Sequence, residues 1–413
     1  MAGYKDSGIE YIGQVPKDWE VLRLKNISNI YAAKEYLFGE WPVEKNGKPY
    51  SPFGEWSSGN EVIITGRVGT IGQYEMLEKN PKKKILINDN RLLIRPFTEN
   101  YRKKALSHFL FWAMAIVNLN DIITGSAVPL ITATSLLKKR IVVPPLPEQQ
   151  RIADFLDTKC SILDRTIDAV SRQIEDLEKY KKALITKTVT KGICKKGEPE
   201  RAMKDSGVEW IGEVPEEWSV KPFKTLAGMK GSSEYTARDI VDEGEGAILL
   251  SPSNINDNKL NLSKRTYISQ KKYDKSTTKI QRGDLLFTKT ASVGKCVIYD
   301  SDEPAMPNPQ LVVLKNIKCL PKFLYYSMVS DVMQAPAKMY VYGSVIPTIS
   351  QLNLGRIKIP VPSPEEQQQI TDYLDEKCKN IDNRVQKRRQ QLEWLKEYKK
   401  SLIFDYVTGK KRV

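Results

Sequence analysis

The sequence is poor in the residue types that most often build metal sites, crosslinks and histidine-based catalysis. Its 413 residues include a single histidine, His108, and five cysteines without CxxC spacing. This composition argues against a zinc site, and an odd number of cysteines predicts free thiols in a reducing compartment. No apolar run reaches the roughly 18 residues of a membrane helix, and the first residues show no apolar signal region. We therefore expect a cytoplasmic globular protein that binds no metal.

The positive charge of the chain is concentrated in two blocks. The formal net charge is +15. Residues 20–143 hold 18 Lys/Arg against 11 Asp/Glu, residues 219–358 hold 20 against 12, and the remaining segments balance. Two separate basic blocks favour a polyanionic partner such as nucleic acid, whereas a basic surface that only keeps the protein soluble is the plainer alternative.

The chain is an internal duplication. "KDSGIEYIGQVPKDW" (5–19) returns as "KDSGVEWIGEVPEEW" (204–218), with ten of fifteen positions identical. "GSAVPLITATSLLKKRIVVPPLPEQQRIADFLDTKC" (125–160) aligns without a gap on residues 343–378. The distance in the sequence between the two copies grows from 199 residues for the first segment to 218 for the second. The difference in length therefore lies between these two repeated segments. Each half has a fixed start, a variable basic middle and a fixed end, which indicates one architecture with two different surfaces; a tandem fold under neutral drift is the alternative.

The fixed ends predict long helices. From Glu148 to about Thr190 there is no Pro or Gly, and Gly192 follows as a C-terminal stop. The apolar residues recur in steps of four and three, with Lys181 in the one gap of the first copy and Arg388 and Lys399 interrupting the second. This seam comprises Leu156, Cys160, Leu163, Ile167, Val170, Ile174, Leu177 and Leu184, then Leu374, Cys378, Ile381, Val385, Leu392, Leu395 and Leu402. At about 1.5 Å per residue each helix is a rod on the order of 65 Å long. Packing of the two rods on each other, antiparallel with one block at each end, is favoured over two independent surface helices.

The fold class that follows is α+β: two duplicated α/β domains separated by two long repeated helices that pack as an antiparallel coiled coil. Residues 61–77, 84–96, 283–300 and 308–316 have the alternation or the apolar runs of strands, and 105–119 and 319–337 predict one buried helix in each block. We place the domain boundaries at 1–143, 144–192, 193–360 and 361–413. The repeated 15-residue segment (5–19 and 204–218), called the opening 15-mer, begins each block. Its turn and core residues are Pro16, Trp19, Pro215 and Trp218.

No catalytic motif stands out. The Gly-Lys pairs at 47, 294 and 409 lack the glycine and hydroxyl positions of a phosphate-binding loop, and "NPQL" at 308 lacks the aromatic of an aminomethyltransferase tetrad. The glycines of 242–250 precede their strand, unlike those of a dinucleotide site. His108 lies within an expected helix and is interpreted as structural. Catalysis by this chain alone is therefore not expected.

The duplicated pattern resembles a known family. Two variable basic domains, each opened by a "SGxxxIGxxPxxW" segment and closed by a "PEQQxI"-like segment that enters a long helix, are similar to the specificity subunit of type I restriction–modification systems. The resemblance covers nearly the whole chain. It implies that each variable block is a target-recognition domain for one half of an asymmetric bipartite DNA site, and that the helices set the spacing and dock two methyltransferase subunits.

The resemblance also implies the cofactors and partners. S-adenosylmethionine is expected on the methyltransferase subunits, ATP and Mg on two restriction/translocase subunits, and neither on this chain, which has no catalytic residues in that family. Double-stranded DNA is the expected ligand, and DNA methylation in host defence is the expected process.

Candidate DNA contacts follow from position and chemistry rather than from the resemblance. Basic side chains suit phosphate or guanine, hydroxyls with adjacent amides suit phosphate, and asparagines suit adenine. The candidates are Arg67, Lys82, Lys83, Lys84, Arg91, Ser126, Asn254, Asn256, Asn258, Lys289 and Ser344. For each of them an ordinary solvated surface role is the alternative.

Two other classes of function stay open at this point. One is a stand-alone DNA-modifying enzyme, a degenerate nuclease or methyltransferase. The other is an interaction protein whose basic blocks bind something other than DNA.

Overall fold

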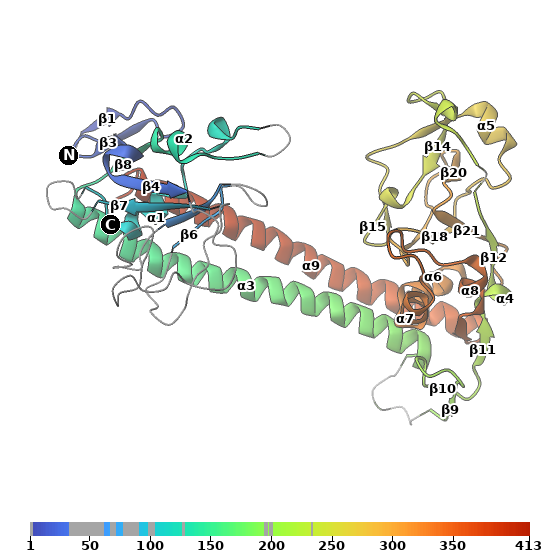
Figure 1. The fold of residues 1–413 in the computed structure, drawn as a ribbon. Coiled ribbons are helices and arrows are strands. Elements are labelled where there is room, and N and C mark those ends of the chain that lie inside the picture. Colours follow the sequence, from blue (N-terminus) through green and yellow to red (C-terminus); the bar gives the residue numbers. More distant parts are fainter. Residues whose placement is uncertain are drawn as a thin grey trace, which may run out of the picture. The chain divides into compact units, whose positions relative to one another are not determined.

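The computed structural model describes residues 3–32, 62–66, 72–76, 91–97, 104–125, 129–193, 197, 201–232 and 234–413. The chain divides into two compact units: Met1–Ser171 with Gln390–Val413 is unit 1, and Arg172–Arg389 is unit 2. Each unit holds one variable block and part of each of two long helices, α3 (Leu146–Lys191) and α9 (Pro364–Val407) (Figure 1). The division therefore runs through the helices, whereas the boundaries predicted above follow changes in composition.

The two long helices run antiparallel within each unit. In unit 2 the Lys181 Nζ lies 2.7 Å from the Asp382 Oδ1, and in unit 1 the Lys399 Nζ lies 2.6 Å from the Asp164 Oδ1. The residue numbers of both pairs add up to 563, which is the mark of one antiparallel register. The two lysines that interrupt the apolar seam therefore reach across to the other helix. α3 stops where Gly192 takes a φ of +76°, a conformation that glycine adopts without steric cost.

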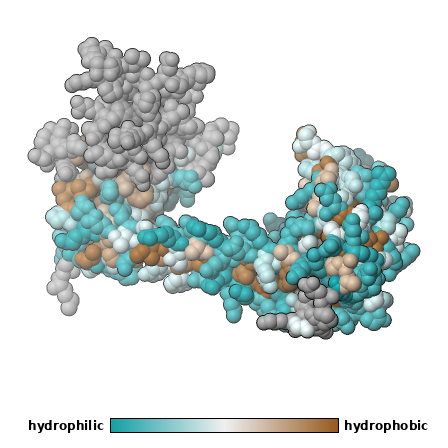
Figure 2. Space-filling view, turned by 90° about the horizontal axis from the view of Figure 1, so that it is seen from below, coloured by the Kyte–Doolittle hydropathy of each residue, from teal (hydrophilic) through white to brown (hydrophobic). Residues whose placement is uncertain are grey.

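The predicted seam lies along the contact between these helices. Leu156, Leu374 and Cys378 are buried, as are Val170 and Ile381. Leu163 and Leu184 are partly buried and pack against the cores of units 1 and 2. Most of the visible surface of the helices is hydrophilic, with scattered hydrophobic residues (Figure 2). These residues of the apolar stripe are thus buried or partly buried.

Unit 1 is built on a four-stranded antiparallel sheet of order β4-β7-β5-β6. Its core lies between this sheet, α1 and the ends of the long helices, and includes Ile64, Leu92 and Phe109. The strands are β1 (Tyr4–Asp6), β2 (Gln14–Pro16), β3 (Glu20–Arg23), β4 (Ser28–Ala32), β5 (Val62–Thr65), β6 (Tyr74–Met76), β7 (Arg91–Pro96) and β8 (Arg140–Val143). The helices are η1 (Leu24–Asn26), α1 (Ser107–Met114), η2 (Asn120–Ile122) and α2 (Ala133–Leu137).

Unit 2 repeats this sheet as β12-β21-β18-β19 and also contains the sheet β13-β17-β14-β20. Alternate residues of β18 face different cores, since Leu285 and Phe287 pack with α6 and Leu286 packs toward the sheet β13-β17-β14-β20. The strands are β9 (Met203–Asp205), β10 (Glu213–Pro215), β11 (Ser219–Pro222), β12 (Gly228–Lys230), β13 (Ile240–Val241), β14 (Gly246–Leu250), β15 (Ile255–Asn256), β16 (Lys259–Leu260), β17 (Tyr267–Ser269), β18 (Leu285–Thr288), β19 (Cys296–Ile298), β20 (Ala305–Pro307), β21 (Leu311–Lys315) and β22 (Lys358–Val361). The helices are α4 (Phe223–Leu226), η3 (Ala237–Asp239), η4 (Pro252–Asn254), α5 (Gln270–Lys275), α6 (Pro321–Val329), α7 (Asp331–Met339) and α8 (Gln351–Arg356).

The predicted single helix over 319–337 is wrong, because α6 and α7 are separate. Ser330 between them is extended (φ −81°, ψ 168°) and buried, and its hydroxyl donates to the Ser327 carbonyl oxygen. The Asp331 N–H that follows donates to Thr186 Oγ1 on α3. A Ser-Asp pair is a helix start signal, and the long helix supplies the acceptor that stabilises the break.

The repeated segments form the same joint in both units. The buried Trp19 donates its indole N–H to Glu148 Oε2 at 3.1 Å, and Trp218 donates to Glu366 Oε2 at 2.8 Å. Each carboxylate sits in the first turn of a long helix, where a negative charge is favourable. A buried indole N–H needs such a partner. The opening 15-mer therefore anchors each block to the start of its long helix.

The glutamine after each of these glutamates caps a second helix. Gln149 Oε1 accepts the N–H of Leu106, the N-cap residue of α1, and Gln367 Oε1 accepts the N–H of Leu320, the N-cap residue of α6. Both glutamines are buried, and their amide nitrogens donate to nearby carbonyl oxygens. The "PEQQ" and "PEEQQ" segments are thus structural connectors.

Each variable block enters and leaves through one short antiparallel pair. In unit 1, β3 pairs with β8, so that Glu20 lies opposite Val143. In unit 2, β11 pairs with β22, so that Ser219 lies opposite Val361. Each block is therefore a closed insertion on a common frame.

Candidate nucleic-acid interface

A loop and a hairpin meet at one edge of each unit. In unit 2 the loop that follows β18 closes with the Gly294 N–H on the Thr288 carbonyl oxygen, and in unit 1 Gly72 donates to Thr65 in the same way. The hairpin of residues 342–348 pairs Tyr342 with Thr348. Its counterpart pairs Thr124 with Leu130. The two units therefore share this combination of a loop and a hairpin. The loop closed by Thr288 and Gly294 is one residue shorter than the loop closed by Thr65 and Gly72.

The structure brings Lys289 and Ser344 to the same edge of unit 2. The Ile349 N–H donates to the Lys289 carbonyl oxygen at 2.9 Å, and Thr290 pairs with Thr348 in the hairpin that carries Ser344. Ser344 is exposed and Lys289 is half-buried. A cationic side chain and a hydroxyl at one edge suit a phosphate, the ligand group for which both residues are candidate contacts.

The three candidate asparagines have different roles. Asn254 is 5% exposed, its Oδ1 accepts the Ser251 N–H, and its Nδ2 donates to the carbonyl oxygens of Asn261 and Lys264. With these bonds made, its amide stabilises the loop and has no group left to read a base. Asn258, at φ +57°, follows Asp257, at φ +49°, in the turn between β15 and β16. Adjacent positive φ values are those of a type I′ hairpin, which favours Asn and Asp.

Asn256 is the one of the three that faces solvent. The Asn258 Oδ1 accepts the Cys296 N–H at 2.9 Å and so joins the hairpin to β19. Lys295 donates its Nζ to the Ile255 carbonyl oxygen at 3.1 Å across the same junction. Asn256 is exposed. Its side chain is therefore accessible to a ligand, unlike that of Asn254.

The unit 1 candidates lie mainly outside the described residues. This holds for Arg67, Lys82, Lys83, Lys84 and Ser126. The backbone of Arg91 begins β7 and pairs with Thr65. The backbone of Arg91 therefore lies next to the end of β5, and the segment that contains Arg67 follows β5 in the sequence.

Sequence reasoning missed an exposed apolar tip on unit 2. Tyr342, Val345 and Ile346 are 57%, 90% and 58% exposed, and Met339 at the end of α7 is 75% exposed. The tip flanks Ser344 at the candidate edge. The residues of the "YGSVIP" segment are of the types found at the end of a buried strand, so the sequence pattern does not predict that their side chains are exposed.

The single histidine lies in a contact that has a counterpart in unit 2. His108 Nδ1 lies 3.3 Å from Asp157 Oδ2, which lies beside the Asp157 Oδ1 that accepts the Trp112 indole N–H. At the equivalent place in unit 2, Tyr326 donates to Asp375. Among these residues no three His, Cys, Asp or Glu side chains gather as metal ligands would, and no helix is both long and apolar enough to cross a membrane. His108 is therefore part of a repeated structural contact.

Comparison with known proteins identifies relatives over the whole length. A family model described as the type I restriction modification DNA specificity domain matches residues 16–179 and again residues 215–393. The MjaVIII specificity subunit of Methanocaldococcus jannaschii, from a type I restriction enzyme, is 24% identical over 100% of this chain and 98% of its own length. The putative MjaX subunit of the same organism is 28% identical over 97% and 96%, and the Escherichia coli EcoBI specificity subunit is 24% identical over 90% and 81%.

A solved structure shares the fold. It comes from work on complex assembly and conformational transition of the type I R-M system, covers 96% of this chain and 99% of its own, and aligns with a TM-score of 0.66 at 17% identity. At that identity the likeness concerns the fold alone.

Proposed function

The chain belongs to the family of type I restriction–modification DNA specificity subunits, and from this premise we propose that its two variable blocks read the two halves of one bipartite DNA site. The observation that carries the proposal is the repeated frame. Both blocks are inserted through the same strand pair and present the same loop and hairpin, yet the loop residues differ. Different side chains at one position of a common frame are what two readers with different base preferences need.

The partners follow from the family. The complex contains two methyltransferase subunits that bind S-adenosylmethionine and two restriction/translocase subunits that use ATP and Mg, and it works in the cytoplasm. This chain contributes recognition and spacing but no catalytic group and no cofactor site. The paired helices α3 and α9 set the gap between the half-sites and dock the methyltransferase subunits.

The proposal is tested by co-expressing the chain with its methyltransferase partner in a host without adenine methylation. Sequencing that detects methylated adenine should then find one motif with two defined halves and a gap of fixed length. Methylation without a bipartite motif would contradict the proposal. Purified chain that methylates or cuts DNA without a partner would support the stand-alone enzyme instead.

Asn256 provides a residue-level test within the same assay. Asn256→Ala should leave the fold intact and lower discrimination at one base pair by about 1–3 kcal/mol if the amide reads an adenine. Asn254→Ala serves as the contrast, because it removes hydrogen bonds inside the loop and should lower stability instead. An Asn256→Ala chain with an unaltered motif and unaltered affinity would remove Asn256 from the reading surface.

A further inference from the structure

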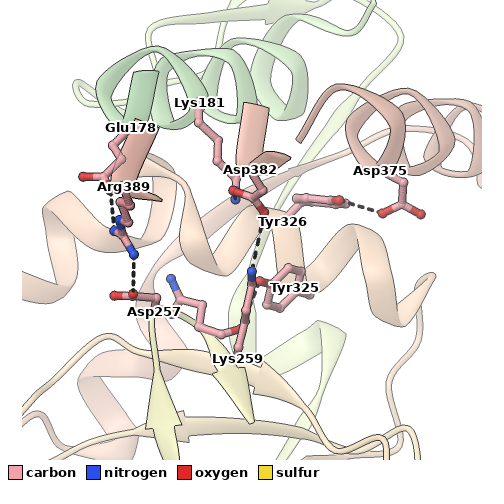
Figure 3. Close-up of polar contacts among 10 residues, drawn as sticks. Glu178, Lys181, Asp257, Lys259, Tyr325, Tyr326, Asp375, Asp382 and Arg389 are labelled. Atoms are coloured by element: carbon pink, nitrogen blue, oxygen red, sulfur yellow. Dashed lines mark hydrogen bonds and ion pairs between the residues drawn. The ribbon is translucent and has the colours of Figure 1, made fainter. Parts of the chain in front are cut away.

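Unit 2 contains an open groove of about 1060 Å³ where the variable block meets the long helices. Its walls come from the β15–β16 turn, the end of the 288–295 loop, α6, α7 and the facing stretches of α3 and α9. Figure 3 shows the arrangement, with Lys181 and Glu178 on α3, Asp382 and Arg389 on α9, and Asp257 and Lys259 on the hairpin. Eleven of its 23 lining residues are charged. Such walls do not suit the mostly apolar surface of a small organic ligand.

The charges of the groove are unbalanced in favour of cations. Seven lining residues are Lys or Arg and four are Asp or Glu. Each carboxylate already has a basic partner within unit 2: Glu178 and Asp257 with Arg389, Asp382 with Lys181, and Asp375 with Lys322. The acidic side chains are therefore satisfied by the chain itself.

Three further lysines line the groove from different elements. Among the residues that the structure describes, no ion pair engages Lys295, Lys338 or Lys379. Lys338 and Lys379 are exposed, so their side chains are accessible to a ligand. A fourth, Lys259, lies 3.8 Å from an Asp382 that already pairs with Lys181 at 2.7 Å. The groove therefore presents an uncompensated positive charge on three different elements.

We propose that this groove holds the sugar–phosphate backbone of the DNA that unit 2 reads, with Lys338 and Lys379 as phosphate-binding positioning residues. The inference rests on the proposed DNA-reading function. The groove adjoins the candidate base-reading residue Asn256, since Asn258 and Lys295 belong both to its lining and to the junction between the β15–β16 hairpin and β19. Lysine side chains that meet phosphate fix the register of a reader without carrying sequence information.

The test is the salt dependence of DNA binding by the complex of the full chain with its methyltransferase subunits. Each phosphate contact contributes about 0.9 to the slope of log affinity against log salt on duplex DNA. The double variant Lys338→Ala/Lys379→Ala should reduce this slope by about 1.8, lower the affinity at fixed salt and leave the methylated motif unchanged. Lys338→Arg/Lys379→Arg should restore the slope.

The matched control removes two lysines elsewhere on unit 2. Lys271 and Lys275 on α5 are exposed and do not line the groove, so Lys271→Ala/Lys275→Ala changes the net charge equally and should leave the slope unaltered. An unaltered slope in the groove variant, with sequence-specific binding by the parent chain, overturns the groove inference alone. Loss of co-purification with the methyltransferase overturns it as well, because the groove would then be a protein contact. A parent complex without any sequence-specific binding overturns the proposed function together with it.

Discussion

At the scale of single residues, the repeated motifs are explained by buried polar contacts. The glutamate of each "PEQQ"-like segment accepts a tryptophan N–H, and the glutamine after it caps the helix that covers the sheet. Two neighbouring side chains thus tie three segments that are far apart in the sequence. A buried polar group whose partner is removed costs about 1–3 kcal/mol, so both positions tolerate little change.

Gln367→Met should weaken the start of α6. The substitution keeps the volume but leaves the Leu320 N–H and the Pro362 carbonyl oxygen without their partner, at a cost of about 1–3 kcal/mol for a buried group. Hydrogen exchange of a peptide that covers residues 318–326 should become faster. Gln368→Met is the control, because Gln368 is exposed and its side-chain amide donates to Asp372 on the same helix. Equal exchange in the two variants would show that the cap does not hold the helix.

The seam cysteines should be unreactive in the folded chain. Burial raises the pKa of the Cys160 and Cys378 thiols to about 11. The thiolate is the reactive form, so alkylation should be slow at pH 8 and accelerate as the pH approaches 11. The same raised pKa stabilises the folded state below pH 9 and ceases to do so as the pH rises through 11. Mass spectrometry of the native and denatured chain measures this, and rapid native labelling at pH 8 would contradict the packing of the seam.

At the scale of elements, the helix pair is held by an apolar seam and by equivalent lysine–aspartate pairs. Lys181 with Asp382 and Lys399 with Asp164 are related by the duplication, because both offsets are 218. The lysines were visible in the sequence as gaps in the heptad pattern. Their partners were not, since a single sequence does not show which residue of another helix faces a given position.

Lys399→Asp should destabilise unit 1, and the charge-swapped pair should recover much of the loss. The Lys399 Nζ bonds both oxygens of Asp164, at 2.6 and 2.8 Å. The single variant brings two carboxylates together, whereas Lys399→Asp/Asp164→Lys restores opposite charges. Lys400→Asp, beside Glu397 on the exposed face, should change the thermal midpoint less. A partly exposed ion pair contributes about 1 kcal/mol or less, so the expected changes in stability are small. A double variant as unstable as the single one would contradict the prediction, because it would show that the pair does not fix the register.

The secondary structure shows where sequence patterns are sufficient and where they are not. The long helices, their seam and the Gly192 stop could be predicted, because periodicity and terminators are local signals. The break at Ser330 could not, since its stability depends on Thr186 of another helix. Asn254 was misleading for the same reason: its hydrogen bonds to Asn261 and Lys264 become visible only in the folded loop.

At the scale of the whole molecule, the chain is one frame used twice. Corresponding strands, the Trp–Glu contact and the Gln cap recur in both units. The duplication and its divergent middle could be predicted from the sequence alone. The groove lysines could not, because Lys338 and Lys379 lie in different helices and their shared opening is a product of the fold.

The central claim is that each closed block carries its own half of the recognised sequence. The block ends provide the splice points, since Ser219 lies opposite Val361 and Glu20 opposite Val143. The decisive measurement is the adenine-methylation motif produced by a chain in which residues 219–361 are replaced by residues 20–143, co-expressed with the methyltransferase partner. We predict a motif in which the half assigned to unit 2 is replaced by a second copy of the half assigned to unit 1. An assembled, active complex that still methylates the parent motif would contradict the account.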